Sequence, residues 1–407
     1  MKTFLISLFI GLNFLCLSFG GFGQKQLSHE ALLPYTTYFD LDESLSLPED
    51  VSQILEVELK THRFVGLAEL HRSKNLSLFT AAFLKLLHEE DFNYFALEVG
   101  PISAQMLQAY SQTPDKIAEK IRQSNRTYGS KTFDIAPFVF ADRKEDALFL
   151  KEAARRDYEL WGLDQEFYDS FELHLDSIYA KDLKKGAEIK GLYEECKSNI
   201  RKWRKKEIWK GNFAYTCSLL EDQSLTAFFS YFTGNPEAET HIEAVTTSLK
   251  IYCKNEQGKG SNQERAYYMQ SNFEQMYKKA QVKDQQPRVF IKMGSVHLSK
   301  GTSIFGVDDM GKFLEEKAAM EKTSYLNIRH LRRYRNGKDL IGKKGWTEVG
   351  LLMKLGKKDA WTLTDLRPMR EALQKGEIQA DKHITYELLN FDFLLIPPND
   401  RKSKPNF

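Results

Sequence analysis

Four short apolar runs in this sequence each end in acidic or histidine side chains, the types that transfer protons and bind metals. The runs are 64–71 (FVGLAELH), 94–100 (YFALEVG), 158–166 (YELWGLDQE) and 288–297 (RVFIKMGSVH). Each has the length and the β-branched or aromatic content of a buried strand. Because ligands of open α/β sheets bind at the carboxyl ends of the strands, we expect one shared crevice. Its predicted residues are Glu69, His71, Glu98, Asp164 and His297.

The spacing within these runs suggests how the side chains cooperate. Glu69 and His71 share one face of the first strand if that strand continues to His71. A carboxylate beside an imidazole orients the ring and raises its basicity, or both bind one metal ion. In the last run, Gly294 lets the backbone approach a ligand before His297 is presented.

Each of these residues also has a structural explanation on its own. Glu98 suits a buried salt bridge, and Asp164 suits the cap of the next helix. Four consecutive core runs that end in ionisable groups would, however, be costly to desolvate if their role were only structural. The convergence therefore favours a functional cluster.

The elements that must position this cluster follow from the apolar periodicity. Helical patterns at 48–62, 75–90 and 142–157 alternate with the first strands, which is the signature of a parallel sheet. Residues 165–286 contain helical stretches and no convincing strand. Further strands are predicted at 324–329, 360–363 and 391–396, helices at 313–322 and 368–375, and a polar tail at 397–407. We predict a single α/β domain over 24–407, with a mainly parallel sheet flanked by helices and a helical insertion or cap at about 165–286.

The start of the chain has the pattern of a signal peptide. Lys2 precedes an apolar stretch at 4–19, and Gly21-Phe22-Gly23 resembles a cleavage site. We expect residues 1–23 to be removed near Gly23 and the protein to be periplasmic or secreted, with no transmembrane segment in the mature chain. An exported protein could pair two of its three remaining cysteines, and the pairing stays open. Those cysteines are Cys196, Cys217 and Cys253.

Composition and missing motifs narrow the function classes. The 407 residues are 42% hydrophobic and carry a net charge of +2, so no overall field attracts nucleic acid. A small-molecule or peptide substrate is the expected partner, and the oligomeric state stays open. The mature chain lacks a Gly-x-Ser-x-Gly elbow, a His-Glu-x-x-His helix, a phosphate loop and a dinucleotide fingerprint. Serine hydrolase, zincin, NTPase and dinucleotide chemistry are therefore disfavoured.

At the strand ends, the sequence resembles the superfamily that joins erythromycin esterases, ChaN haem-uptake proteins and Tiki or TraB proteins. The resemblance covers most of 64–301 and rests on four short motifs: Ala68-Glu69-Leu70-His71, Ala96-Leu97-Glu98, Gly162-Leu163-Asp164 and Gly294-Ser295-Val296-His297. It implies the same α/β fold with a helical insertion. The esterase-like members are taken to activate water with a histidine that glutamates support. In this chain Arg265, within 264–269 (ERAYYM), resembles their site arginine and would stabilise an oxyanion or hold a substrate carboxylate.

The other members imply different chemistry at the same residues. Tiki-like proteins are metal-dependent peptidases with two Gly-x-x-His motifs, and here Ala68 stands in place of the first glycine. ChaN-like proteins bind haem without hydrolysis. The Glu-x-His spacing of Glu69 and His71 matches these two groups better than the esterase Glu-x-x-His.

Three hypotheses follow. In the first, an exported hydrolase uses His71, oriented by Glu69 or Glu98, as the general base on water, while His297 and Arg265 stabilise negative charge near Asp164. In the second, a divalent ion (Zn, Mn or Fe) is bound by four of these side chains, which are Glu69, His71, Glu98 and His297. In the third, the protein binds haem or another ligand without catalysis.

Overall fold

The computed structural model describes residues 24–182, 186–210 and 215–407, so the predicted signal peptide at 1–23 lies outside it. Eight strands form one sheet in the order β2-β10-β12-β7-β3-β6-β4-β5. Their bounds are β2 (Thr36–Phe39), β3 (His62–Glu69), β4 (Tyr94–Leu97), β5 (Glu159–Gly162), β6 (Val289–Gly294), β7 (Ser324–His330), β10 (Trp361–Asp365) and β12 (Phe393–Ile396). The six strands from β12 to β5 in this order pair parallel with their neighbours. β10 pairs antiparallel with both of its neighbours, β12 and β2. The predicted α/β fold with a mainly parallel sheet is confirmed.

The late strand β6 lies between the two early strands β3 and β4. Glu69 is in register with Gly294, and Leu97 is in register with Lys292. Residues far apart in sequence therefore meet at one edge of the sheet. The carboxyl ends of β3, β6, β4 and β5 lie next to one another in that order.

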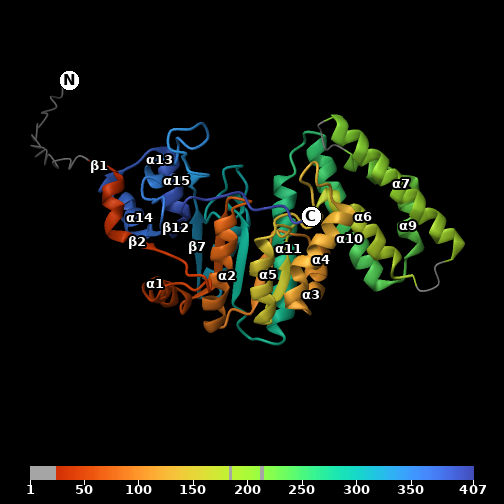
Figure 1. The fold of residues 1–407 in the computed structure, drawn as a ribbon, viewed down its shortest axis with the longest axis horizontal. Coiled ribbons are helices and arrows are strands. Elements are labelled where there is room, and N and C mark those ends of the chain that lie inside the picture. Colours follow the sequence, from red (N-terminus) through yellow and green to blue (C-terminus); the bar gives the residue numbers. More distant parts are fainter. Residues whose placement is uncertain (1–23, 183–185, 211–214) are drawn as a thin grey trace, which may run out of the picture.

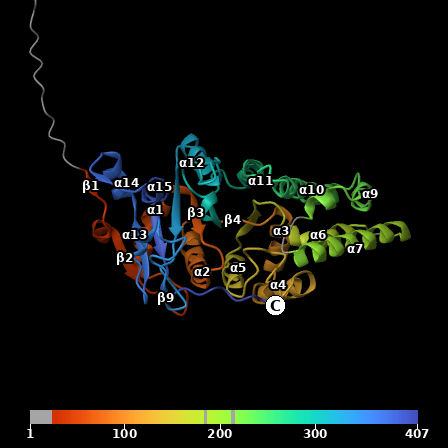
Figure 2. The ribbon, with the colours of Figure 1, turned by 90° about the horizontal axis from the view of Figure 1, so that it is seen from above.

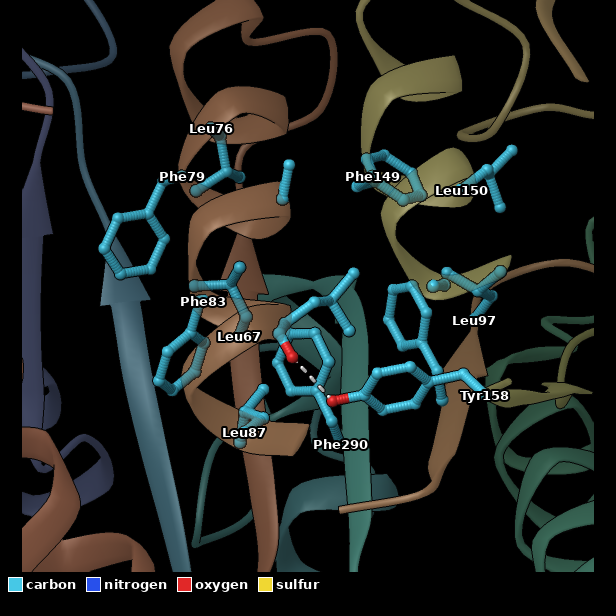
Figure 3. Packing of buried hydrophobic residues seen from close by; sticks show 14 of the residues in the cluster. Leu67, Leu76, Phe79, Phe83, Leu87, Leu97, Phe149, Leu150, Tyr158 and Phe290 are labelled. Atoms are coloured by element: carbon cyan, nitrogen blue, oxygen red, sulfur yellow. Dashed lines mark hydrogen bonds between the residues drawn. The ribbon is translucent and has the colours of Figure 1, made fainter. Parts of the chain in front are cut away.

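Helices cover both faces of the sheet (Figures 1 and 2). One face carries α2 (Lys74–Glu89) and α5 (Asp146–Arg155), and the other carries α11 (Asn262–Gln281) and α12 (Met310–Met320). On the first face, Phe79 and Phe83 of α2 pack in one buried cluster with Phe290 of β6 (Figure 3). Burying each such side chain contributes roughly 1.5–3 kcal/mol. The Ser73 hydroxyl caps α2 by accepting the Leu76 amide at 3.0 Å, which fixes the turn after β3.

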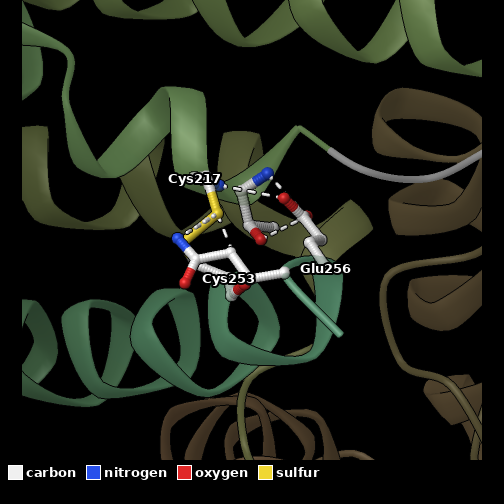
Figure 4. Close-up of a disulfide and its surroundings, with 5 residues drawn as sticks. Cys217, Cys253 and Glu256 are labelled. Carbon is white, nitrogen blue, oxygen red and sulfur yellow. Dashed lines mark hydrogen bonds between the residues drawn. A yellow bond between two sulfur atoms is a disulfide. The ribbon is translucent and has the colours of Figure 1, made fainter. Parts of the chain in front are cut away.

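The described residues between β5 and β6 form helices and no strand, and α7 and α9 extend away from the sheet (Figure 1). A disulfide between Cys217 of α8 and Cys253 of α10 joins two of these helices (Figure 4). Cys196 is a free, buried thiol. The helices of this segment are α6 (Phe171–Tyr179), α7 (Ala187–Lys210), α8 (Thr216–Leu220), α9 (Gln223–Tyr231), α10 (Pro236–Glu256) and α11.

The remaining elements complete the two layers around the sheet. The helices are α1 (Glu49–Leu59), α3 (Pro101–Ser111), α4 (Ile117–Tyr128), α13 (Gly350–Met353), α14 (Arg367–Gln374) and α15 (Lys382–Asn390). Four 3-10 turns are described, η1 (His29–Tyr35), η2 (Pro114–Lys116), η3 (Tyr168–Ser170) and η4 (Ser295–His297). Two small sheets pair β1 (Lys25–Gln26) with β11 (Ile378–Gln379) and β8 (Tyr334–Arg335) with β9 (Lys338–Asp339). Within the described ranges, every helix is too short or too polar to serve as a membrane span.

Several details differ from the sequence prediction, and two of them bear on the site. The first strand ends at Glu69 and does not continue to His71, because the chain turns at Arg72, where φ is 64°. Residues 397–407 are not a free polar tail. They form backbone bridges to Ser73 and Arg143, and the side chains of Ser403 and Asn406 are buried.

Candidate functional site

The structure brings all six predicted site residues into one connected cluster at the carboxyl ends of four strands. His71, Glu98 and Asp164 lie just after β3, β4 and β5, respectively. His297 lies in the 3-10 turn η4, which follows β6. Helix α11 supplies Arg265, so the helical segment reaches this edge of the sheet. Glu69, the last residue of β3, is the sixth member.

His71 lies between two carboxylates that face opposite nitrogens of its ring. Its Nδ1 is 3.3 Å from Glu69 Oε1, and its Nε2 is 3.7 Å from Glu98 Oε2. Glu69 accepts from Lys292, on the sheet face that carries α5, whereas Glu98 accepts from Arg265 of α11, on the other face. The imidazole therefore spans the end of β6 from one face of the sheet to the other.

Gly294 makes room for this ring. A Cβ at Gly294 would lie 2.8 Å from His71 Nε2, which is closer than real Cβ contacts. The Gly294 amide also donates to Glu98 Oε2 at 2.5 Å. The glycine was expected to admit a ligand, and in the structure it admits the imidazole.

The charges around His71 raise its pKa. Burial alone would lower the pKa of His71, but the carboxylates of Glu98 and Glu69 outweigh burial. Burial would likewise raise the pKa of Glu69, yet the Lys292 ammonium and His71 hold it at about 2. An imidazolium at His71 is thus stabilised, while Glu69 stays ionised across the ordinary pH range.

Arg265 neutralises the acidic side of the cluster. Its Nε and Nη2 donate to the two oxygens of Asp164 at 2.8 and 2.6 Å, and Nη2 also donates to Glu98 Oε1 at 3.0 Å. Burial raises the pKa of Asp164, but Arg265 outweighs it, so the net shift is downward. A bidentate pair of this kind fixes the position of both groups. The first role of Arg265 is therefore to hold Asp164 and Glu98 in place.

His297 is oriented by a carboxylate at its Nδ1 that the sequence did not predict. Its Nδ1 is 2.8 Å from Asp309 Oδ2, and its Nε2 is 3.5 Å from Glu98 Oε1. Burial lowers the pKa of His297, but the Asp309 hydrogen bond and Glu98 outweigh it and raise the pKa. Asp309 also caps α12 by accepting the Met310 amide at 2.8 Å, so in sequence it resembles an ordinary helix cap.

Two further residues of the site were not predicted. Lys292 is buried and donates to Glu69 Oε1 at 2.7 Å. The signal for it was present, because a lysine inside the apolar run 288–297 needs a buried partner. Phe140 stacks on the His71 ring with centroids 3.7 Å apart and planes 10° apart. No pattern in the sequence points to this contact.

Exposure separates the accessible residues from the supporting ones. The side chain of His71 is 32% exposed and that of Arg265 is 24% exposed, while Glu69 and Glu98 are 5% and 3% exposed. His71 is therefore the most accessible of these four side chains, and the two acids are buried beside it.

The donor set also suits a divalent ion. One ligand atom each from Glu69, His71 and Glu98 lies within 4.8 Å of the others, whereas His297, the fourth predicted ligand, is not in this group. These nitrogen and oxygen donors fit Zn, Mn or Fe. In the present geometry, however, the two carboxylates face different ring nitrogens and already bond to Lys292 and Arg265. An ion at His71 Nε2 would therefore take Glu98 as its carboxylate ligand and leave Glu69 to orient the ring.

Comparison with solved structures shows which proteins share this fold. An erythromycin esterase mutant in its open conformation is 18% identical, with a TM-score of 0.55 over 91% of this chain and 100% of the other. A succinoglycan biosynthesis protein is 15% identical, with a TM-score of 0.55 over 92% and 97% of the two chains. A Bacillus cereus protein is 13% identical, with a TM-score of 0.54 over 93% and 98%. No protein-family model and no curated protein sequence matches the chain. The predicted resemblance is confirmed at the level of the fold.

Proposed function

We propose that this protein is a hydrolase, acting on an ester or related bond, in which His71 is the general base that activates water. The observation that carries this proposal is the position of the His71 imidazole, which is partly exposed and has a buried carboxylate at each ring nitrogen. Such an arrangement favours proton uptake by the ring. The fold shared with an erythromycin esterase is consistent with it.

The proposed reaction begins with neutral His71. We assign its Nδ1–H to Glu69, the nearer carboxylate, which leaves Nε2 to accept a proton from water. The distances of 3.3 and 3.7 Å are longer than hydrogen bonds, and such contacts commonly tighten when substrate binds. As the water attacks the substrate carbonyl, the imidazolium that forms is stabilised by Glu69 and Glu98.

Negative charge that develops on the substrate oxygen needs a cation. The bonds of Arg265 to Asp164 and Glu98 use Nε and Nη2, so we assign Nη1 to this oxyanion. His297, held by Asp309, fixes Glu98 from the buried side. Collapse of the tetrahedral intermediate then expels the alcohol, which takes its proton from His71.

The test uses a panel of p-nitrophenyl esters with short and long acyl chains. Replacing His71 with alanine should lower kcat by about 10²–10⁴, the usual range for a positioned general base. His383→Ala is the matched control, because His383 lies on α15 and is exposed. Full activity of the His71→Ala variant on an ester that the wild type hydrolyses would overturn the assignment.

A second candidate function keeps these residues and adds a divalent ion, as in a metal-dependent peptidase. The closeness of the Glu69, His71 and Glu98 donor atoms favours it. When bound, the ion would lower the pKa of a coordinated water and so supply the nucleophile. Elemental analysis of protein purified without chelator separates the two functions. A metal-free preparation that is fully active would eliminate this one.

We also propose that the protein is exported after cleavage near Gly23. The disulfide between Cys217 and Cys253 supports export, because disulfides persist in oxidising compartments. Mass spectrometry of the protein from periplasmic or culture fractions should give a chain that begins at Gln24. A full-length chain confined to the cytoplasm would contradict the proposal.

A further inference from the structure

Both loops that enclose His71 contain a strained residue. Arg72, next to His71, has φ of 64°, and Phe140, which stacks on His71, has φ of 68°. Left-handed backbone at residues other than glycine is unfavourable and persists only where the surroundings enforce it. The two conformations therefore need an external support.

Residues 400–406 provide that support, and we name this segment the strap. Its hydrogen bonds to the His71 loop run from the Ser403 amide to the Arg72 carbonyl at 3.0 Å and from the Lys74 amide to the Arg401 carbonyl at 2.9 Å. On the Phe140 side, the Lys144 amide donates to the Lys404 carbonyl at 3.0 Å. The strap thus holds two loops, one that precedes α2 and one that follows α4 in the sequence.

The strap is fixed at both of its ends. At one end, the buried carboxylate of Asp400 accepts from Arg332 Nε at 2.6 Å. At the other, Asn125 of α4 donates to the Asn406 carbonyl at 2.8 Å, and Asn406 donates to the Ala118 carbonyl at 2.9 Å. In Figure 1 the segment runs from the β12 side of the sheet to the label C beside α4.

Besides these backbone hydrogen bonds, ion pairs also connect the strap with both loops. Asp134 accepts from Lys402 of the strap at 2.8 Å and from Arg72 at 3.4 Å, and it also bonds to Arg143. The side chain of Arg143 is buried. One carboxylate therefore joins the His71 loop, the Phe140 loop and the strap.

We propose that the strap and Phe140 are positioning elements that set the plane of the His71 imidazole between Glu69 and Glu98, a role that rests on the proposed general-base function of His71. The carboxylates alone do not fix the ring, because Nδ1 and Nε2 lie 3.3 and 3.7 Å from them and Nδ1 has no hydrogen bond. The stacked ring of Phe140 restricts rotation about the bond that carries the imidazole. The strap keeps Phe140 against it.

The first experiment removes the stacked ring. Phe140→Ala should lower kcat for a p-nitrophenyl ester about tenfold with KM within about twofold, the pattern of lost orientation rather than lost binding. Phe140→Tyr, which keeps a ring, should restore kcat. Phe133→Ala is the matched control, because Phe133 lies in the same loop and is 51% exposed.

The spectroscopic readout does not depend on activity. In protein labelled with ¹³C-histidine, the His71 ring signals, assigned with the His71→Gln variant, should be shifted upfield by the stacked ring. Phe140→Ala should remove this shift and broaden the signals, and Phe133→Ala should leave them unchanged. Ring signals that are unaffected by Phe140→Ala would overturn the positioning role of Phe140.

The second experiment breaks the strap without deleting it. Ser403→Pro removes the amide that donates to the Arg72 carbonyl. Ser403→Ala is the matched control, because it keeps the amide and loses a hydroxyl that has no hydrogen-bond partner. Ser403→Pro should move the His71 signals in the same direction as Phe140→Ala and lower kcat, while circular dichroism stays that of a folded protein. Wild-type His71 signals and kcat in Ser403→Pro would overturn the role of the strap.

The outcomes distinguish a failure of this inference from a failure of the proposed hydrolase function on which it rests. If the wild type hydrolyses esters and His71→Ala does not, while Phe140→Ala and Ser403→Pro behave as wild type, only the positioning inference fails. If no ester is hydrolysed but the ring signals respond as expected, the orientation of His71 stands and the hydrolase function fails.

Discussion

The imidazole of His71 occupies the space that a side chain at Gly294 would fill. A Cβ there would lie 2.8 Å from His71 Nε2 and 3.3 Å from Glu98 Oε2. The glycine therefore allows a ring to cross the end of β6 and meet a carboxylate on each face of the sheet.

Replacing Gly294 with alanine should displace the His71 ring and lower kcat by about 10²-fold, because misplacement of a catalytic group by 1 Å can cost that much. Ester hydrolysis and the melting temperature measure the two effects separately. Gly350→Ala is the matched control, since nothing lies within 4 Å of the Cβ that it would add. Wild-type kcat in Gly294→Ala would show that the close approach is not needed.

Lys292 should be essential for stability through Glu69. Lys292→Met leaves the buried Glu69 carboxylate without its cation, which should lower the free energy of unfolding by about 3–5 kcal/mol. The double variant Glu69→Gln/Lys292→Met removes both charges and should regain part of the loss. Urea unfolding measures each variant. A double variant no more stable than Lys292→Met would contradict a charge-pair explanation.

The pH dependence of hydrolysis should report the raised pKa of His71. The neutral ring is the base, so kcat/KM should rise with pH through that pKa and be lost below it. Glu69, with a pKa of about 2, stays ionised and does not produce this rising limb of the pH profile. Removing its charge should shift the limb to lower pH, because one of the carboxylates that raise the His71 pKa is gone.

That shift is best measured as the difference between Glu69→Gln/Lys292→Met and Lys292→Met, because Lys292 itself lowers the pKa of His71 and both variants lack it. A limb that stays in place or moves to higher pH would show that Glu69 does not act on the His71 pKa.

The disulfide should stabilise the helical segment. It closes a separation of 36 residues, for which the chain-entropy model gives about 4 kcal/mol. The Cys217→Ala/Cys253→Ala variant should melt at a lower temperature than the wild type. A reductant should lower the wild type to the same value and leave the variant unchanged. Equal melting temperatures without reductant would contradict a stabilising role.

Local patterns predicted seven of the eight strands of the main sheet, all but β2, and the five ionisable residues at or just after strand ends. Buried strands have an apolar composition that can be recognised in a short window. They did not predict where each strand ends. The first run has the composition of a strand as far as Leu70, yet β3 ends at Glu69, since the turn at Arg72 depends on contacts made elsewhere in the chain. The orientation of His71 was therefore beyond a local pattern.

The order of the strands and the strap were likewise hidden in the sequence. Nothing in residues 288–297 indicates that β6 separates β3 from β4, because parallel neighbours are chosen by the whole fold. The strap is polar, and many of its contacts use backbone amides and carbonyls, which every residue except proline offers. Its composition therefore resembles that of a tail, although it packs across two loops.

The position of β6 has a consequence for how the chain reaches its folded state. Glu98 and Gly294 are 196 residues apart, so β3 and β4 are synthesised long before the strand that separates them. Until then, each presents an unpaired edge that can bind its wrong neighbour or another chain. A polypeptide built this way gains from staying unfolded until synthesis is finished.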